Sequence, residues 1–163
     1  MQKHVYRIIV VASALVLAGG GWVLASGQRA GANQNFTVGE TLTNFEYVGA
    51  DGTTSISTFP AQFVPGDRLF SRFTLTQGST VVGFATFVDT ATFNDDDVAT
   101  GIYALTGRGD IHVTFYVRNG FDFAHLPTVD DGTIDGGTFA YAHASGSVHA
   151  TQQGGVYTAS FSF

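Results

Sequence analysis

The sequence predicts an all-β fold, a closed antiparallel β-barrel of about eight strands, preceded by an N-terminal signal-peptide helix. Three observations support this prediction. Apolar and polar residues alternate with a period of two in several segments after residue 36, and no window there repeats apolar residues at helical spacing. Glycine supplies 21 of the 163 residues, enough to form many tight turns. Aromatic residues make up 13% of the chain and charged residues only 12%, which is typical of a compact aromatic core.

Residues 1–25 have the parts of a secretory signal peptide. Lys3 and Arg7 form a short basic start, and the apolar run IIVVASALVLA follows at residues 8–18. A glycine triplet then interrupts the helix, and small residues suited to a cleavage site come after it. We therefore expect the protein to be secreted or extracytoplasmic.

An uncleaved membrane anchor is the competing interpretation of this segment. Residues 22–25 extend the apolar stretch to about the minimum length of a membrane span. In that case the membrane is contacted only through the uncleaved signal peptide, and the domain is still exported. Residues 26–35 are polar and glycine-rich, so we expect a flexible leader there and the barrel domain over residues 36–163.

The alternation is clearest at residues 110–118, where Ile111, Val113 and Phe115 share one face. We favour the interpretation that this apolar face points into the barrel, since small barrels fill their interior with side chains. The opposite face would then form the outer wall or an oligomer contact; in the alternative orientation it would line a cavity. Residues 156–163 alternate in the same way. The other expected strands are residues 40–48, 68–76, 80–90, 98–106 and 143–151.

Turn-forming residues separate these strands, because Gly, Asn and Asp tolerate the positive φ angles that tight turns need. A phenylalanine-rich last strand favours closure, since an exposed apolar edge promotes aggregation. The expected turns include residues 51–52, 65–67, 77–79, 94–97, 107–109, 119–120, 131–132 and 154–155.

The charge distribution excludes one large class of partners. The net charge of the chain is −6. Residues 36–163 contain four arginines and all thirteen acidic residues, so the net charge of this part is −9. A domain this acidic lacks the basic surface that a nucleic-acid backbone requires, so no nucleic-acid partner is expected. The chain has no cysteine, which excludes disulfides, thiolate metal sites and cysteine nucleophiles.

No metal site is expected either. His143 and His149 are six positions apart, which places them on one face of a strand roughly 20 Å from each other. The acidic run at residues 95–97 lacks the alternating pattern of a dedicated calcium loop, so a solvated turn is the better interpretation.

Four segments in order resemble the allene oxide cyclase barrel superfamily, which includes the dirigent proteins. They are PGDRLF at residues 65–70, VG at 82–83, GRGDIHV at 107–113 and IDGGTFAYAHASG at 134–146. The resemblance covers roughly residues 42–163. Phe139 stands where the family has its third glycine, so the turn there is expected to differ locally. The cyclases' cysteine and the dirigent aspartates have no counterpart.

The resemblance implies an aromatic-lined barrel that binds a small hydrophobic molecule. Cyclisation, isomerisation or stereocontrol in such a barrel works by restricting conformation and needs no cofactor, so none is expected. Glu46 lies about where the cyclases have an early glutamate, and Arg72 falls near a family asparagine; these two are the candidate catalytic residues, with a solvent-facing position as the alternative for each. The candidate ligand-binding residues are Phe73, Phe84, Tyr103, Phe115 and Tyr141.

The sequence leaves the choice between an enzyme and a binding protein open. A non-enzymatic carrier, an extracellular interaction module or a structural barrel fits the same composition. Family members often form dimers or trimers and 15 phenylalanines are many for one small core, so a homo-oligomer is expected.

Overall fold

The computed structural model describes residues 35–56, 60, 62–93, 96–118, 120, 128–153 and 156–163. The predicted signal peptide, and the predicted leader up to residue 34, lie outside the described residues. In the part of the chain that is described, no helix is long and apolar enough to cross a membrane.

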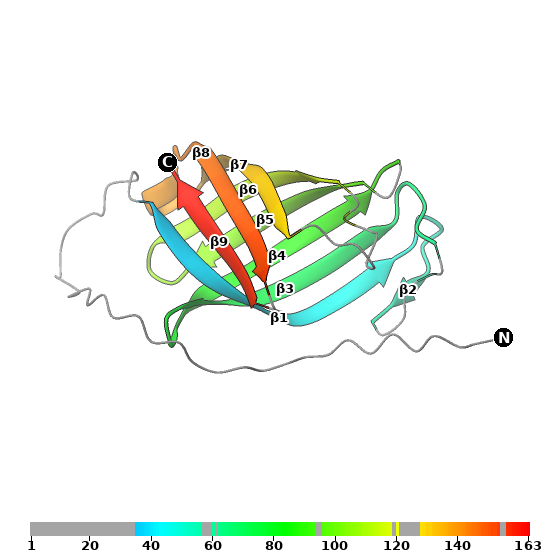
Figure 1. Ribbon diagram of the computed structural model, residues 1–163, viewed down its shortest axis with the longest axis horizontal. Coiled ribbons are helices and arrows are strands. Elements are labelled where there is room, and N and C mark those ends of the chain that lie inside the picture. The colour runs from blue at the N-terminus through cyan, green and yellow to red at the C-terminus, as the bar shows by residue number, and fades with distance from the viewer. Residues whose placement is uncertain are drawn as a thin grey trace.

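The predicted closed antiparallel barrel of eight strands is confirmed (Figure 1). β1 pairs with β3, each later strand pairs with the next along the chain, and β9 returns to pair with β1. The two-residue β2 pairs only with the end of β1. The strands are β1 (Phe36–Val48), β2 (Thr54–Ser55), β3 (Arg68–Gln77), β4 (Thr80–Ala91), β5 (Asp97–Leu105), β6 (Gly109–Val117), β7 (Val129–Gly137), β8 (Gly146–Gln153) and β9 (Val156–Ser162).

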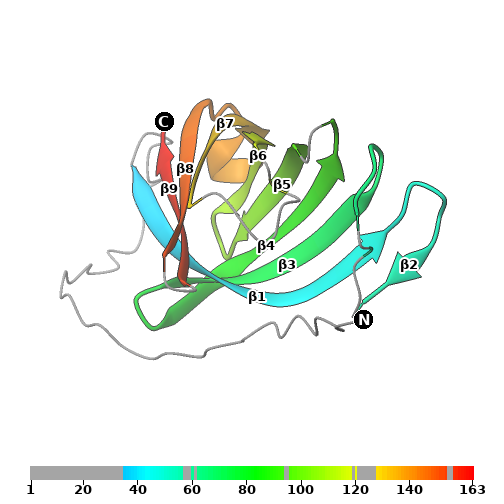
Figure 2. The ribbon, with the colours of Figure 1, turned by 45° about the vertical axis from the view of Figure 1, so that its right-hand side comes forward.

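The up-and-down order gives the barrel two different ends (Figure 2). The connections that follow β1, β4, β6 and β8 lie at one end. We call it the carboxylate end, because Asp89, Asp97 and Asp130 lie near it. The connections that follow β3, β5 and β7 lie at the other, together with the start of β1 and the end of β9. We call this second end the aromatic end.

The sequence prediction lacks strand β7. It places a turn at residues 131–132, but these residues lie within this strand. Gly132 fits there because the ring of its cross-strand partner Phe115 occupies the adjacent space: a β-carbon on Gly132 would lie 2.7 Å from Cδ1 of that ring. The strand expected at residues 143–151 also begins later, since β8 starts at Gly146 and the short 3-10 helix η1 (Phe139–Tyr141) precedes it.

The apolar face of β6 points inward, as favoured from the sequence. Ile111, Val113 and Phe115 are all buried in the main core cluster. Tyr116, on the opposite face, is 58% exposed. The burial of β5 alternates in the same way, with Tyr103 at 1% exposure and Ile102 at 42%.

Stacked rings close the aromatic end. Phe36 stacks on Phe161 with 4.7 Å between ring centroids, and Tyr141 of η1 stacks on Phe163 at 5.7 Å. The guanidinium of Arg108 lies 5.1 Å from the Phe36 ring and 5.4 Å from the Tyr141 ring. This end of the interior is therefore filled by protein side chains.

Phe139, at the start of η1, has an unusual backbone conformation. Its φ of 49° lies in the left-handed region, and it is the one non-glycine residue of the described chain with a positive φ. The side chain is 88% exposed, so no packing of the ring offsets the strain.

Candidate functional site

Inward-facing side chains are buried to different degrees along the barrel. Cross-strand register identifies them, since directly paired residues share a face. Toward the aromatic end they are buried, for example Val38, Leu75, Ile111 and Val148. Toward the carboxylate end many are only half-buried, for example Phe45, Ser71, Phe73, Phe87, Asp89, Asp130, Gln152 and Tyr157, whereas Tyr47, Ala91, Asp97 and Ala99 are buried. Part of the inward-facing wall is therefore in contact with solvent toward the carboxylate end.

Four aromatic residues form a connected arc inside this half of the barrel. The centroid of Phe73 lies 6.1 Å from that of Tyr157 and 5.9 Å from that of Phe87. The Phe87 centroid in turn lies 5.4 Å from that of Tyr103. The arc uses strands β3, β4, β5 and β9, so it spans the interior rather than one stretch of wall.

Glu40 brings a carboxylate to this arc. The Tyr103 hydroxyl donates a hydrogen bond to it, while its Oε1 is buried and has no hydrogen-bond partner. Burial raises the pKa of Glu40, and the Tyr103 hydrogen bond only partly opposes this. Burial and the nearby Glu40 also raise the pKa of Tyr157, whose hydroxyl accepts a 2.9 Å hydrogen bond from Gln152. A carboxylate placed between two phenols in an aromatic setting is chemically suited to move a proton.

Three aspartates face inward nearer the rim. Asp89 on β4 pairs with Ala99, Asp97 on β5 pairs with Ala91, and Asp130 on β7 lies two residues before Gly132. Burial raises the pKa of Asp89 to about 7, with a contribution from the charge of Asp130. Burial, and then the charges of Asp89, Asp130 and Asp96, raise the pKa of Asp97 to about 8. Burial followed by the charge of Asp131 raises the pKa of Asp130. We call Asp89, Asp97 and Asp130 the aspartate trio.

The structure brings together three of the five predicted ligand-binding residues. Phe73 and Tyr103 belong to the arc, and Phe115 joins it through Phe87, whose centroid is 6.2 Å away. Phe84 instead lies on the outer wall, 42% exposed, because its neighbour Ala85 takes the inward position. Tyr141 lies in the stacked rings of the aromatic end.

The two predicted catalytic residues lie on the outside of the barrel. Glu46 is exposed and pairs with Phe70 across β1 and β3. Arg72 is exposed too, and its guanidinium lies 4.7 Å from the centroid of the outward-facing Phe84. Neither side chain reaches the arc or the aspartate trio, and their catalytic role stays a prediction that this placement does not favour.

A β-bulge explains why Glu40, and not Glu46, is inside. The two residues are six apart, so in a regular strand they would share a face. The register between β1 and β3 shifts between Leu42 and Asn44, which inserts Thr43 as an extra residue and reverses the later alternation. The sequence does contain a signal for Asp89 and Asp97, because each continues the period-two alternation of an inward face. Asp89 follows Phe87 by two residues, and Asp97 precedes Ala99 by two.

Two clefts flank the carboxylate end along the connection from β1 to β3. One, of about 560 Å³, is lined by residues that include Tyr47, Thr54 and Asp67. The other, of about 300 Å³, is lined by residues that include Phe63, Ala91 and Thr92. Neither is lined by the arc or the trio.

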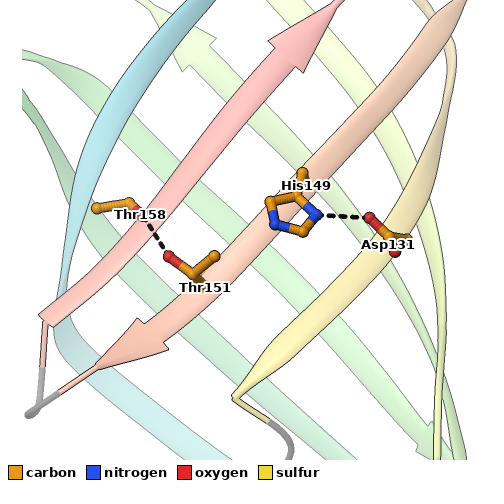
Figure 3. Close-up of polar contacts among 4 residues, drawn as sticks. All are labelled: Asp131, His149, Thr151 and Thr158. Carbon is orange, nitrogen blue, oxygen red and sulfur yellow. Dashed lines mark hydrogen bonds and ion pairs between the residues drawn. The ribbon is translucent and has the colours of Figure 1, made fainter.

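The outer wall of β7, β8 and β9 carries polar pairs instead (Figure 3). Nδ1 of His149 lies 2.6 Å from Oδ1 of Asp131, and the hydroxyls of Thr151 and Thr158 are 2.6 Å apart. Across the described ranges, no group of three or more histidine or acidic side chains is placed to hold a metal ion.

Comparison with known proteins supports the fold. No protein-family model and no curated protein matches the chain. Among solved structures, a pyocyanin demethylase is similar, with a TM-score of 0.57 and 16% sequence identity over 77% of this chain and 98% of that one. At this level of identity the likeness concerns the fold, so this chain has the barrel architecture of that protein.

Proposed function

We propose that this protein binds a small hydrophobic molecule with an aromatic part at the carboxylate end of its barrel, and that Glu40 performs a cofactor-free proton transfer on it. The observation that carries the proposal is the Glu40 carboxylate, buried beside the arc with one oxygen unpartnered and the other held by Tyr103. The likeness to a protein whose name describes a demethylase acting on a small molecule supports it.

The proposed step is an isomerisation. The ionised Glu40 takes a proton from one carbon of the ligand, and the resulting acid returns it at another position, so no oxidant or reductant is consumed. A carboxylate with a raised pKa is a stronger base than an ordinary one, which favours this role near neutral pH. The arc would hold the ligand in one conformation, which also suits the cyclisation or stereocontrol implied by the resemblance to allene oxide cyclases and dirigent proteins.

Binding is tested first, by native mass spectrometry of the purified protein compared with its denatured mass. A retained small molecule supports the proposal and identifies its chemical class. Ala150→Phe should abolish retention because Ala150 is half-buried and directly paired with Asp130, so a ring there fills the site. The matched control is His149→Phe, one residue earlier on the outer wall, which should retain the ligand. Equal retention by both variants would place the ligand elsewhere.

Proton transfer is tested with the retained molecule in deuterated water. The wild-type protein should exchange ligand hydrogen for deuterium, and Glu40→Gln should stop the exchange while binding persists. Glu46→Gln is the control, since Glu46 lies outside; loss of exchange in that variant alone would support the sequence-based assignment instead. Binding without exchange in the wild type would favour the second candidate, a non-enzymatic carrier.

We also propose that the barrel forms a homo-oligomer, a dimer or trimer, through the outer wall of β4 and β5. Val81 is 64% exposed there, and Phe84 and Ile102 are each 42% exposed. The wall of β7, β8 and β9 carries hydroxyl and ion pairs (Figure 3), and its exposed large apolar residues in the described chain are Val129 and Val156, at the strand starts. Ile102→Asp should lower the mass measured by light scattering to that of one chain, whereas His149→Asp should leave it unchanged. A wild-type mass of one chain would contradict the proposal.

Export is proposed from the N-terminal sequence. Expression of the full chain in a bacterium should place the protein outside the cytoplasm, with a mass reduced by about the 25 residues of the segment. A full-length mass in the membrane fraction would favour the anchor, and a full-length cytoplasmic protein would contradict export.

A further inference from the structure

We propose that the ligand is a planar aromatic cation, whose positive charge is held by the aspartate trio while its rings contact the arc. This inference rests on the proposed binding function and specifies its ligand class. It adds a positive charge to the small hydrophobic molecule expected from the sequence, and the reason lies in the charges that face the site.

The trio concentrates negative charge from three strands in one place. Asp89 and Asp97 sit diagonally across the β4–β5 pair, which puts their β-carbons about 7–8 Å apart or less. Asp97 also pairs with Val117 at the end of β6, and Asp130 lies two residues before Gly132, the β7 partner of Phe115. The aspartates therefore lie on one side of the barrel interior, contributed by three different strands.

No described basic side chain faces this region. Arg68 lies over Phe70 and Arg72 over Phe84, both on the outer wall. Arg108 lies at the opposite end of the barrel, and Arg118 is exposed beyond β6. The described histidines 112, 143 and 149 lie on the outer face of β6, just before β8 and on the outer face of β8. The described part of the protein thus offers the trio no positive partner of its own.

Asp97 supplies a separate indication of a missing partner. Its side chain is among the most buried polar groups, with 3% exposure, and Oδ1 has no hydrogen-bond partner. A buried acceptor without a donor costs about 1–3 kcal/mol, and more when it is charged. This oxygen lies against Gly120, just after β6, so a ligand that brings a positive charge or an N–H group would have to reach it beside that glycine.

The neighbouring rings explain why the cation should be flat and aromatic. Phe87 precedes Asp89 by two residues on the same face of β4, so ring and carboxylate lie side by side. Phe87 also makes T-shaped contacts with Phe73 and Tyr103, and a further flat ring would extend this kind of contact. Aromatic faces attract cations as well, which reinforces the selection made by the carboxylates.

The test uses three two-ring probes of nearly equal shape: 1-methylquinolinium, a permanent cation; 1-methylnaphthalene, its neutral counterpart; and 1-naphthoate, an anion. Binding is measured by equilibrium dialysis at pH 9, above the pKa values of Asp89 and Asp97. The cation should bind about tenfold more tightly than the neutral probe, and the anion most weakly. At pH 5, where Asp89 and Asp97 are protonated, the preference for the cation should become much smaller. Simple hydrophobic partition predicts the reverse order at pH 9, since the neutral probe is the most apolar.

Asp130→Asn and Asp131→Asn form a matched pair on adjacent residues of β7. Asp130 faces the interior, whereas Asp131 points outward to His149. Asp130→Asn should weaken cation binding severalfold, and Asp131→Asn should leave it unchanged. Equal effects of the two variants would assign the preference to the overall surface charge and overturn the inference.

The remaining outcomes separate the two proposals. If 1-methylnaphthalene binds as tightly as the cation and Asp130→Asn has no effect, the proposed preference for a cation is wrong, but the proposed binding of a small molecule is not contradicted. If no probe binds and native mass spectrometry finds no retained molecule, both proposals are wrong. Thermal unfolding of each variant, measured alongside, ensures that a loss of binding is not a loss of folding.

Discussion

The ring of Phe87 occupies the space that a β-carbon on Gly101 would need. The two residues are direct cross-strand partners on β4 and β5, and such a carbon would lie 2.3 Å from Cε1 of the ring. The absence of a side chain on Gly101 therefore lets Phe87 lie across the interior, where it contacts Phe73, Tyr103 and Phe115. The arc of the candidate site depends on a glycine that itself carries no chemistry.

Gly101→Ala should displace the Phe87 ring and lower the free energy of unfolding by about 1–3 kcal/mol, the usual cost of overpacking a core. Chemical denaturation measures the change. Because the cause is one steric contact, adding Phe87→Leu should make the alanine less costly than it is in the wild type, giving a favourable coupling in the double-mutant cycle. Additive effects of the two substitutions would show that the ring does not respond to Gly101.

The aspartate trio should make the protein more stable in mild acid than in mild alkali. The folded-state pKa values of Asp89 and Asp97, about 7 and about 8, lie above the ordinary 3.8 of an aspartate. Between pH 4 and pH 8 the folded protein therefore holds protons that the unfolded chain has released. The stabilisation is complete below about pH 4 and is lost as the pH rises through the folded values. We expect the midpoint of thermal unfolding to be about 5 °C higher at pH 5 than at pH 9.

Charge-neutral variants provide the control for this dependence. Asp97→Asn removes the aspartate with the higher of the two raised pKa values, so the difference between pH 5 and pH 9 should shrink, as it should in Asp89→Asn. Asp131→Asn, on the outer wall, should leave it unchanged. Asp51 does not interfere, because hydrogen bonds from Thr53 lower its pKa and it is ionised throughout this range. A midpoint that rises from pH 5 to pH 9 would contradict the prediction.

Phe139→Gly should stabilise the protein. Glycine adopts the φ of 49° without the steric cost of about 1–2 kcal/mol that other residues incur, although its greater freedom in the unfolded chain returns part of that gain. The ring is 88% exposed, so little buried surface is lost. We expect a net gain of about 1 kcal/mol in urea unfolding. The converse control is Gly107→Ala at φ 71°, which should destabilise; a loss of stability in Phe139→Gly would show that the ring makes a contact of its own.

Asp67→Ala should destabilise the connection from β1 to β3. Asp67 is 2% exposed, and its two oxygens accept hydrogen bonds from the backbone N–H groups of Ala50, at 2.8 Å, and Val64, at 3.0 Å. Removing a charged acceptor leaves both donors without it, at a cost of about 3 kcal/mol. His149→Ala is the comparison, since the exposed His149–Asp131 pair should contribute at most about 1 kcal/mol. Similar losses for the two variants would contradict the assigned role of Asp67.

Sequence patterns predict only part of the candidate site. Phe73, Tyr103 and Phe115 could be chosen because period-two alternation assigns them to inward faces. Phe84 lies on the outer wall because Ala85, its neighbour, continues the inward series. Small residues at inward positions make room for rings from other strands, and that relation is visible only once the strands are paired.

The sequence by itself determined the all-β class, the direction of the apolar face of β6 and most strand positions, because alternation and turn residues are local properties. Only the tertiary structure decided which carboxylates are inside. The bulge at Thr43 turns Glu46 outward and leaves Glu40 beside Tyr103, and strand pairing gathers Asp89, Asp97 and Asp130 from distant parts of the chain. For the same reason, the sequence does not predict β7. Gly132 suits a turn as well as a strand, and its place in β7 depends on the ring of Phe115 on another strand, which no local pattern reveals.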